Sequence, residues 1–148
     1  MFDDLDLLLI QELQRDARIS ISQLARQLGH PIPTIRDRIK RLERNGVITG
    51  YKAVIDPVKI GFSLKALIQI SVDVAVRSSE EFLNELGKVV EVESAFLVSG
   101  EFEAVILVHA RSVEDLRRIV YDEIPRIPGV SGTNTMLVFS DSHWEVPR

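Results

Sequence analysis

Cysteine is absent from the 148 residues of the chain, and histidine occurs only three times. The absence of cysteine excludes disulfides, Cys nucleophiles, iron–sulfur clusters and Cys-based zinc sites, and His30, His109 and His143 are too scattered to suggest a metal site. Long apolar runs are also missing, because the longest clean one is Leu7–Ile10 and a transmembrane helix needs about 18 residues. Residues 1–4 lack the basic start of a signal peptide. We therefore expect a cytoplasmic protein without a cofactor, a metal or a membrane partner.

The composition is that of a folded protein, with 45% hydrophobic and 27% charged residues. The net charge of −4 by itself argues against a nucleic-acid partner. This average hides an asymmetry, because residues 1–60 carry 10 basic and 8 acidic side chains, whereas residues 61–148 carry 8 and 14. Five of the basic residues lie between Arg36 and Arg44. A basic patch on an otherwise acidic chain indicates a local anion-binding surface.

Three short amphipathic helices are predicted before the Asn-Gly pair at positions 45–46. Asp3 can cap the first helix, whose leucines follow at helical spacing. Ser20 and Gln23 form a capping-box pattern at the start of the second helix, and Gly29 ends it. The third helix is expected over residues 31–44, so the segment has the element order of a small helical domain.

The third helix has a basic outward face when Ile35, Ile39 and Leu42 face the core. The second helix has the small Ala25 where the third helix would cross it, and a tight turn separates the two helices. This is the pattern of a helix-turn-helix, which presents its second helix to the DNA major groove. The alternative is a three-helix core with a solvated basic face. The residues expected to contact DNA are Ser22, Gln23, Pro33, Thr34, Arg36, Asp37, Arg38, Lys40, Arg41 and Arg44.

The segment over residues 47–55 alternates apolar and polar residues around Gly50, which predicts two short strands and a turn, the wing that often follows a recognition helix. Asp56-Pro57 ends it. Tyr51 and Lys52 could reach the DNA backbone, although residues at such positions more often belong to a linker strand, and we prefer the linker interpretation.

Beyond residue 61 the hydrophobic period changes to two, which predicts strands. A strand over residues 64–74 precedes a helix that Ser78 and Glu81 open with a capping box. Strands near residues 92–99 and 102–110 then precede a helix capped by Ser112 and a last strand near residues 130–139. The order βαββαβ predicts a ferredoxin-like antiparallel sheet with both helices on one face.

The other face of this sheet is also apolar, and two helices cannot cover both faces. An exposed apolar face of several hundred Å² normally marks a partner surface, and a domain of this size has a thin core. We therefore expect an obligate dimer with the sheets face to face. The residues assigned to the open face are Leu67, Leu97, Val105, Leu107, Met136 and Val138.

Several motifs together resemble one known family. They are Phe2-Asp3-Asp4-Leu5-Asp6, Leu9-Ile10, Leu13-Gln14, Asp16-Ala17-Arg18-Ile19-Ser20, Leu24-Ala25, Arg38-Ile39-Lys40-Arg41-Leu42-Glu43, Gly46-Val47-Ile48 and Gly61. These motifs, which cover essentially the whole chain, resemble the Lrp/AsnC (feast/famine) transcription regulators.

The resemblance implies an α+β fold with two domains. Residues 1–60 would form a winged helix-turn-helix DNA-binding domain with a linker strand, and residues 61–148 a ferredoxin-like domain for dimerisation and effector binding. It also implies a sequence-specific regulator that binds double-stranded DNA as a homodimer or octamer. Such a regulator responds to an amino acid or similar small effector, sensed at contacts between dimers.

Two departures from the family pattern stand out. The family usually has a Ser where the third helix begins, whereas this chain has His30-Pro31-Ile32-Pro33, and two prolines remove two N–H groups that can bind phosphate. The family also has an Asp three residues after a Gly in the effector loop, where this chain has Glu103 after Gly100.

A carboxylate of this loop can pair with a ligand ammonium, while nearby hydroxyls and backbone N–H groups take its carboxylate. The expected effector-binding residues are Ser99, Gly100, Glu101, Phe102, Glu103, Thr133, Asn134 and Thr135. The alternative is that residues 99–103 are only a hairpin turn and that the threonines are ordinary strand residues.

An enzyme is the competing class, because Glu101 and Glu103 could do acid–base work together with His109. His109 lies six residues further along the strand, about 20 Å away, so no catalytic cluster is expected and no catalytic residues are assigned. A segment typical of sirohaem decarboxylases, which share the fold, is also absent at residues 100–105. A third possibility is an architectural protein that compacts DNA with little sequence preference.

Overall fold

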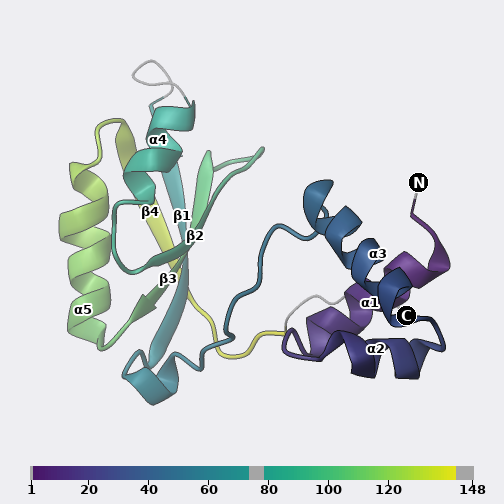
Figure 1. The fold of residues 1–148 in the computed structure, drawn as a ribbon. Helices are drawn as coiled ribbons and strands as arrows, with labels where there is room; N and C mark the ends of the chain where they lie inside the picture. The colour runs from purple at the N-terminus through teal and green to yellow at the C-terminus, as the bar shows by residue number, and fades with distance from the viewer. Residues whose placement is uncertain (1, 74–78, 143–148) are drawn as a thin grey trace. The chain divides into compact units, whose positions relative to one another are not determined.

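The computed structural model describes residues 2–73 and 79–142. They form two compact units, one built from residues 2–54 together with Ser142 and the other from residues 55–141. The first unit is helical, and the second is a sheet with helices on one face (Figure 1).

The first unit contains α1 (Asp4–Arg15), α2 (Ile21–Leu28) and α3 (Ile32–Arg44). The predicted caps are confirmed, because Asp3 and Asp6 form a reciprocal capping box on α1, and Ser20 and Gln23 form one on α2. Gly29 follows α2 with a φ of 68°, the left-handed conformation that glycine adopts without strain. These caps fix where each helix starts and stops, and so they fix the turn between α2 and α3.

The core of the first unit lies where the three helices meet. Leu9, Leu24 and Ile35 come from different helices and are fully buried. Ala25 is buried beside them, as predicted for a close helix crossing. Leu42 closes this core near the end of α3.

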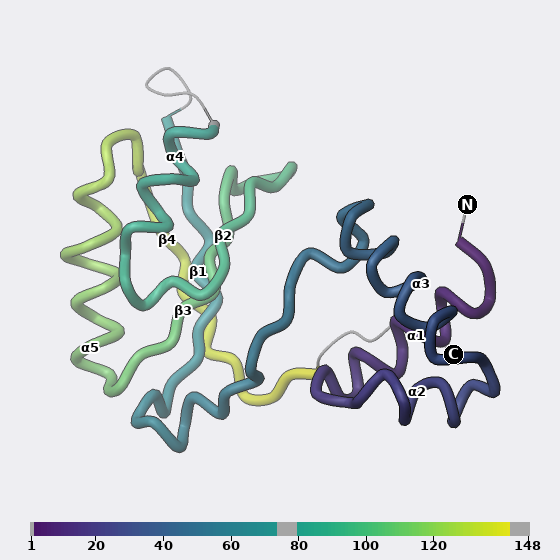
Figure 2. The backbone as a smooth tube through the Cα atoms, viewed as in Figure 1, coloured from purple at the N-terminus to yellow at the C-terminus, as the bar shows by residue number. Residues whose placement is uncertain are grey.

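The prediction of a wing was wrong. Residues 45–57, all of them described, contain no strand. Residues 45–48 turn at the end of α3, and an extended segment follows them (Figure 2). Gly50 has no positive φ and makes no turn. A two-stranded hairpin on its own is marginally stable, and in this segment Val54 stays 86% exposed. The period-two pattern here belongs to an extended linker.

The second unit contains η1 (Val58–Ile60), β1 (Leu64–Val72), α4 (Ser79–Leu86), β2 (Val92–Leu97), β3 (Ala104–Ala110), α5 (Val113–Arg118) and β4 (Val130–Leu137). The four strands form one sheet in the order β2-β3-β1-β4, and every neighbouring pair is antiparallel. The predicted ferredoxin-like order is confirmed, with α4 and α5 on the same face of the sheet (Figure 1). No helix in the described part of the chain is long and apolar enough to cross a membrane.

Several elements of the second unit are shorter than predicted. β2 and β4 end two residues early, and β3 begins two residues late. Ser112 caps α5 as expected, through a bond from the Asp115 N–H, but the regular helix ends at Arg118. The chain continues as a π-turn over Ile119–Glu123 and a 3-10 turn over Ile124–Arg126. Pro125 explains this change, because a proline has no N–H for the helical hydrogen bond and its ring clashes with the carbonyl four residues earlier in a regular α-helix. The predicted Ser78 cap lies outside the described residues.

The two faces of the sheet differ in burial. Ile68, Ile70 and Ile106 are fully buried beneath the helices. On the open face Leu67 lies directly opposite Leu107 and Met136, across three strands.

The assignment of Leu97 to the open face was wrong. Leu97 pairs with Ala104 on the helix-covered face, whereas Phe96 pairs with Val105 on the open face and is 53% exposed. A register shift between Val92 and Ser94 explains the difference, since a bulge changes which residues of a strand share a face.

Candidate nucleic-acid interface and effector loop

The start of α3 carries few free N–H groups. Pro31 is its N-cap and makes no side-chain cap bond, and Pro33 occupies the first turn. Neither proline has an N–H, so Ile32 and Thr34 keep the N–H groups of this turn. Phosphate binding at this helix end therefore depends more on side chains than on the backbone.

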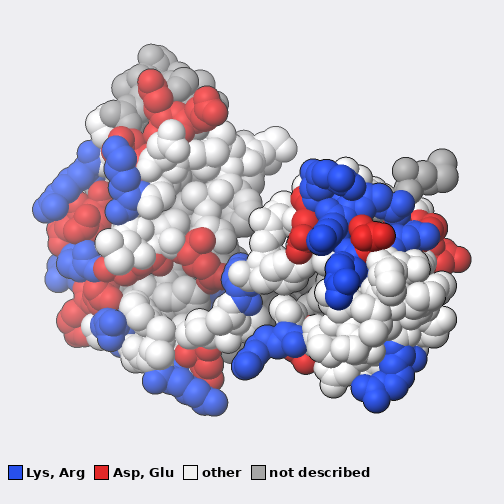
Figure 3. Space-filling view, viewed as in Figure 1, with Lys and Arg blue, Asp and Glu red and all other residues white. Residues whose placement is uncertain are grey.

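Three exposed basic side chains lie in a row along α3. Arg36, Lys40 and Arg44 follow each other at intervals of four residues, so they form one stripe on the helix surface. We call these three residues the basic stripe. Lys and Arg side chains gather over this part of the helical unit (Figure 3). Pro33 and Asp37 are exposed on the same side of the helix.

Arg38 and Arg41, two of the expected DNA contacts, are paired with acidic residues at the start of α1. Arg38 Nη1 donates to Asp6 Oδ1 at 3.2 Å and to Asp3, and Arg41 Nη2 donates to Asp6 Oδ2 at 2.6 Å. Their side chains are 25% and 41% exposed, while Asp6 is completely buried. The outward half of α3 is thus divided into the basic stripe and a flank that meets the acidic start of α1.

The remaining predicted DNA contacts lie at the surface of α2 and α3. Ser22 and Gln23 are exposed in the first turn of α2, where the Gln23 amide oxygen also accepts a bond from the Ser20 N–H at 3.2 Å. Thr34 is partly buried in the first turn of α3.

Tyr51 follows α3 on the linker and contacts it through one hydrogen bond. Its hydroxyl donates to Glu43 Oε1 at 2.9 Å. Partial burial and this bond to a carboxylate raise the pKa of Tyr51 to about 12. Sequence reasoning placed Tyr51 near the DNA backbone or in a linker strand, and it did not predict this contact with α3.

The connection between β2 and β3 forms a loop that extends beyond the sheet (Figure 2). Ser99, Gly100 and Glu101 are exposed on it, and Phe102 and Glu103 are partly buried. Gly100 has a φ of 145°, which strains any other residue, although nothing lies within 4 Å of the place its Cβ would take.

The Glu103 carboxylate already has a partner within the chain. The Val72 N–H donates to Glu103 Oε2 at 2.8 Å, and the Glu103 N–H donates to the Ile70 carbonyl at 3.1 Å. Both bonds tie the end of the loop to β1. A ligand ammonium can meet the other carboxylate oxygen without breaking the first bond, because a carboxylate accepts at several positions.

The predicted effector residues on β4 are separated from this loop. Thr133 pairs with Ile70, which pairs with Ala104, so β1 lies between them and the spacing is about 10 Å. Thr133 and Thr135 belong to the helix-covered face, whereas Asn134 lies on the open face and donates to Gln69 at 2.8 Å. One chain therefore brings residues 99–103 together but does not bring the threonines to them.

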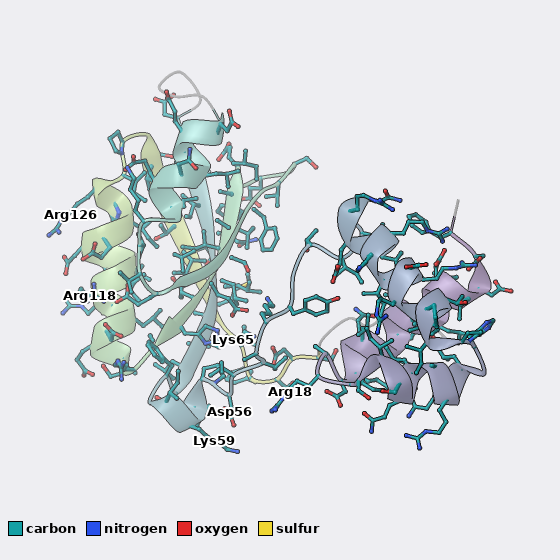
Figure 4. The ribbon with its side chains drawn as sticks, viewed as in Figure 1. Arg18, Asp56, Lys59, Lys65, Arg118 and Arg126 are labelled. Carbon is teal, nitrogen blue, oxygen red and sulfur yellow. The ribbon has the colours of Figure 1, made fainter. Side chains whose placement is uncertain are left out.

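Other charged side chains of the second unit form ion pairs with one another. Arg118 projects away from the sheet (Figure 4) and pairs with Glu91, with Asp115 at 2.8 Å and with Glu123 at 3.0 Å. A shallow recess beside it is lined by Glu114, Arg117, Arg118, Tyr121 and Asp122.

His109 lies 2.5 Å from Glu93 on the open face, and not beside Glu101 or Glu103. Among the described residues, no group of three or more His, Asp and Glu side chains could hold a metal.

Comparison with known proteins gives two family matches. Residues 2–49 match a winged helix-turn-helix DNA-binding model, and residues 65–143 match the Lrp/AsnC ligand-binding domain. The chain belongs to the Lrp/AsnC family of transcriptional regulators. The first match ends at residue 49, before most of the segment in which we expected the wing.

Similar proteins from bacteria cover almost the whole chain. The chain is 31% identical to the leucine-responsive regulatory protein of Klebsiella pneumoniae, over 94% of this chain and 85% of that protein. It is also 31% identical to the proline dehydrogenase transcriptional activator of Rhizobium radiobacter, over 92% and 88%. The structure of the feast or famine regulatory protein of M. tuberculosis, complexed with L-methionine, matches with a TM-score of 0.88 and 30% identity, over 99% and 100% of the two chains.

Proposed function

We propose that this Lrp/AsnC-type regulator binds double-stranded DNA through α3 and the first turn of α2. The observation that carries the proposal is the exposed basic stripe of Arg36, Lys40 and Arg44 on the second helix of a helix-turn-helix. Ser22, Gln23, Pro33, Thr34 and Asp37 complete the surface as groups that position the helix or read base edges. Arg38 and Arg41 lie on its flank. The protein acts in the cytoplasm as a binding protein and not as an enzyme.

The second unit is the effector sensor in this proposal. Its effector is a small molecule that carries an ammonium group, and an amino acid is the first candidate. The loop at residues 99–103 supports this, because Glu103 keeps one carboxylate oxygen for a cation. The threonines on β4 are about 10 Å from this loop in one chain, so they would take part only if the site included a second copy.

The open sheet face supports a homodimer. Leu67, Leu107 and Met136 form a row across three strands, and Phe96 and Val105 extend it. A second copy with the same apolar row is a matching partner, because a two-fold interface joins the same patch on both subunits. Dimers can then assemble into octamers, and a two-fold dimer favours a palindromic DNA site.

A panel of amino acids that includes L-methionine and L-leucine tests the effector. A ligand at 100 times its dissociation constant should raise the unfolding free energy by about 2.7 kcal/mol, which a melting curve detects. Glu103→Gln keeps an acceptor for the Val72 N–H but loses the charge, so it should abolish the shift. Glu114→Gln is the matched control, because Glu114 is exposed on α5 outside this loop, and it should keep the shift. No shift with any amino acid would contradict the effector assignment.

A further inference from the structure

We propose that Asp3 and Asp6, at the start of α1, act as an internal substitute for DNA phosphates. They neutralise Arg38 and Arg41, so that α3 binds the DNA backbone through the basic stripe alone. The inference rests on the proposed DNA surface, and it gives a role in DNA binding to a buried acidic residue outside that surface.

The geometry of the acidic pair supports this role. Asp6 Oδ1 accepts from Arg38 and Asp6 Oδ2 from Arg41, while Asp3 Oδ2 accepts a further bond from Arg38 Nη1. The Asp3 N–H also donates to Asp6 Oδ2 at 3.2 Å, which joins the cap of α1 to the cluster. A carboxylate as buried as Asp6 is costly unless it is paired and hydrogen-bonded, so the two arginines are held on the flank of α3.

The charges of this cluster cancel. Two carboxylates face two guanidinium groups, and Arg38 holds the pKa of Asp3 below its ordinary value, which keeps that carboxylate ionised. A guanidinium binds carboxylate and phosphate oxygens in the same way, so the acidic pair occupies Arg38 Nη1 and Arg41 Nη2, which could otherwise donate to DNA. The basic stripe is different, because its three side chains are exposed on another side of the helix.

Salt dependence measures this difference directly. Each phosphate that a protein neutralises steepens the fall of log affinity with log salt concentration by about 0.9. Lys40 and Arg41 are neighbours on α3 and carry the same charge, so Lys40→Gln and Arg41→Gln form a matched pair. On a duplex of random sequence, Lys40→Gln should flatten the slope by about 0.9 per helical unit, whereas Arg41→Gln should leave it unchanged.

Removal of an acidic residue should have the opposite effect and steepen the salt dependence of DNA affinity. Asp6→Asn removes the central carboxylate, so the arginines become available to DNA. Affinity should then fall about 3.5-fold more between about 50 and 200 mM salt for each phosphate gained. Asp4→Asn is the matched control, because Asp4 is exposed in the same turn and makes the same change in net charge. It should leave the slope unchanged.

The outcomes separate the inference from the DNA surface on which it rests. If Arg41→Gln flattens the slope as much as Lys40→Gln, Arg41 binds phosphate and the inference is wrong. A lower melting temperature for Asp6→Asn with an unchanged slope also overturns it, because the role would then be structural only. If Asp6→Asn does not fold, the Lys40 and Arg41 pair decides alone. Unchanged slopes for both Lys40→Gln and Arg44→Gln overturn the proposed DNA surface, and the inference with it.

Discussion

At the scale of single residues, neighbours decide what a charged side chain does. Arg38 and Lys40 are two positions apart on α3, yet Arg38 meets two carboxylates and Lys40 is exposed. Glu103 follows the same logic, because its carboxylate accepts the Val72 N–H. Residue type predicts that a side chain can bind an anion or a cation, but contacts from distant elements decide which partner it has.

Tyr51 offers a pH test of its contact with α3. The pKa of its hydroxyl is about 12 in the folded chain and 10.0 ordinarily. Since the folded pKa is raised, the contribution to stability is complete below pH 10 and is lost as pH rises through 12. A titration of tyrosinate absorbance should show a late step that Tyr51→Phe removes and Glu43→Gln moves to lower pH. If Tyr51→Phe instead removes a step near pH 10, the contact is absent in solution.

At the scale of elements, local signals in the sequence predicted the helices well. The Asp3 cap, the Ser20 capping box and the turn at Gly29 depend on residues within four positions, and the structure confirms them. The wing at residues 47–55 failed because a strand needs a partner, and the pattern of one segment does not show whether a partner exists.

Contacts between elements that are distant in the sequence could not be predicted from the sequence alone. Period-two alternation predicted the apolar open face, but the bulge in β2 moved Phe96 to that face in place of Leu97. A helical-wheel projection of α3 separated its core side from its outward side. It did not show that residues at the start of α1 cover one flank of α3. Asp6 interrupts an otherwise apolar stripe of the first helix, and this was the sequence signal for a buried ion pair. An acidic residue is rarely buried unless it is paired.

The open face of the sheet predicts the effect of one substitution on assembly. Leu107 lies at the centre of this face, so Leu107→Asp places a charge where two sheets would meet. The wild-type chain should sediment as a dimer or larger species and the variant as a monomer with a cooperative melting curve. Val90→Asp is the control, because Val90 is 92% exposed and lies outside the strands. A monomeric wild type, or an oligomer that Leu107→Asp leaves intact, would contradict the dimer.

At the scale of the whole molecule, the chain combines a DNA-binding unit with a ligand-binding unit. The excess of positive charge lies in residues 1–60 and the excess of negative charge in residues 61–148. This division directs DNA toward the helical unit, because the second unit repels phosphates. It also explains how a chain with a net charge of −4 can bind nucleic acid.

A footprint of the full chain on chromosomal DNA tests the central claim most directly. A regulator whose two recognition helices are related by two-fold symmetry should protect a few roughly palindromic sites, with half-sites about one helical turn, or a multiple of it, apart. Arg44→Gln should weaken protection at all of them alike, because a phosphate contact carries no sequence information. Uniform protection along the DNA would indicate an architectural protein that compacts DNA and would contradict sequence-specific regulation.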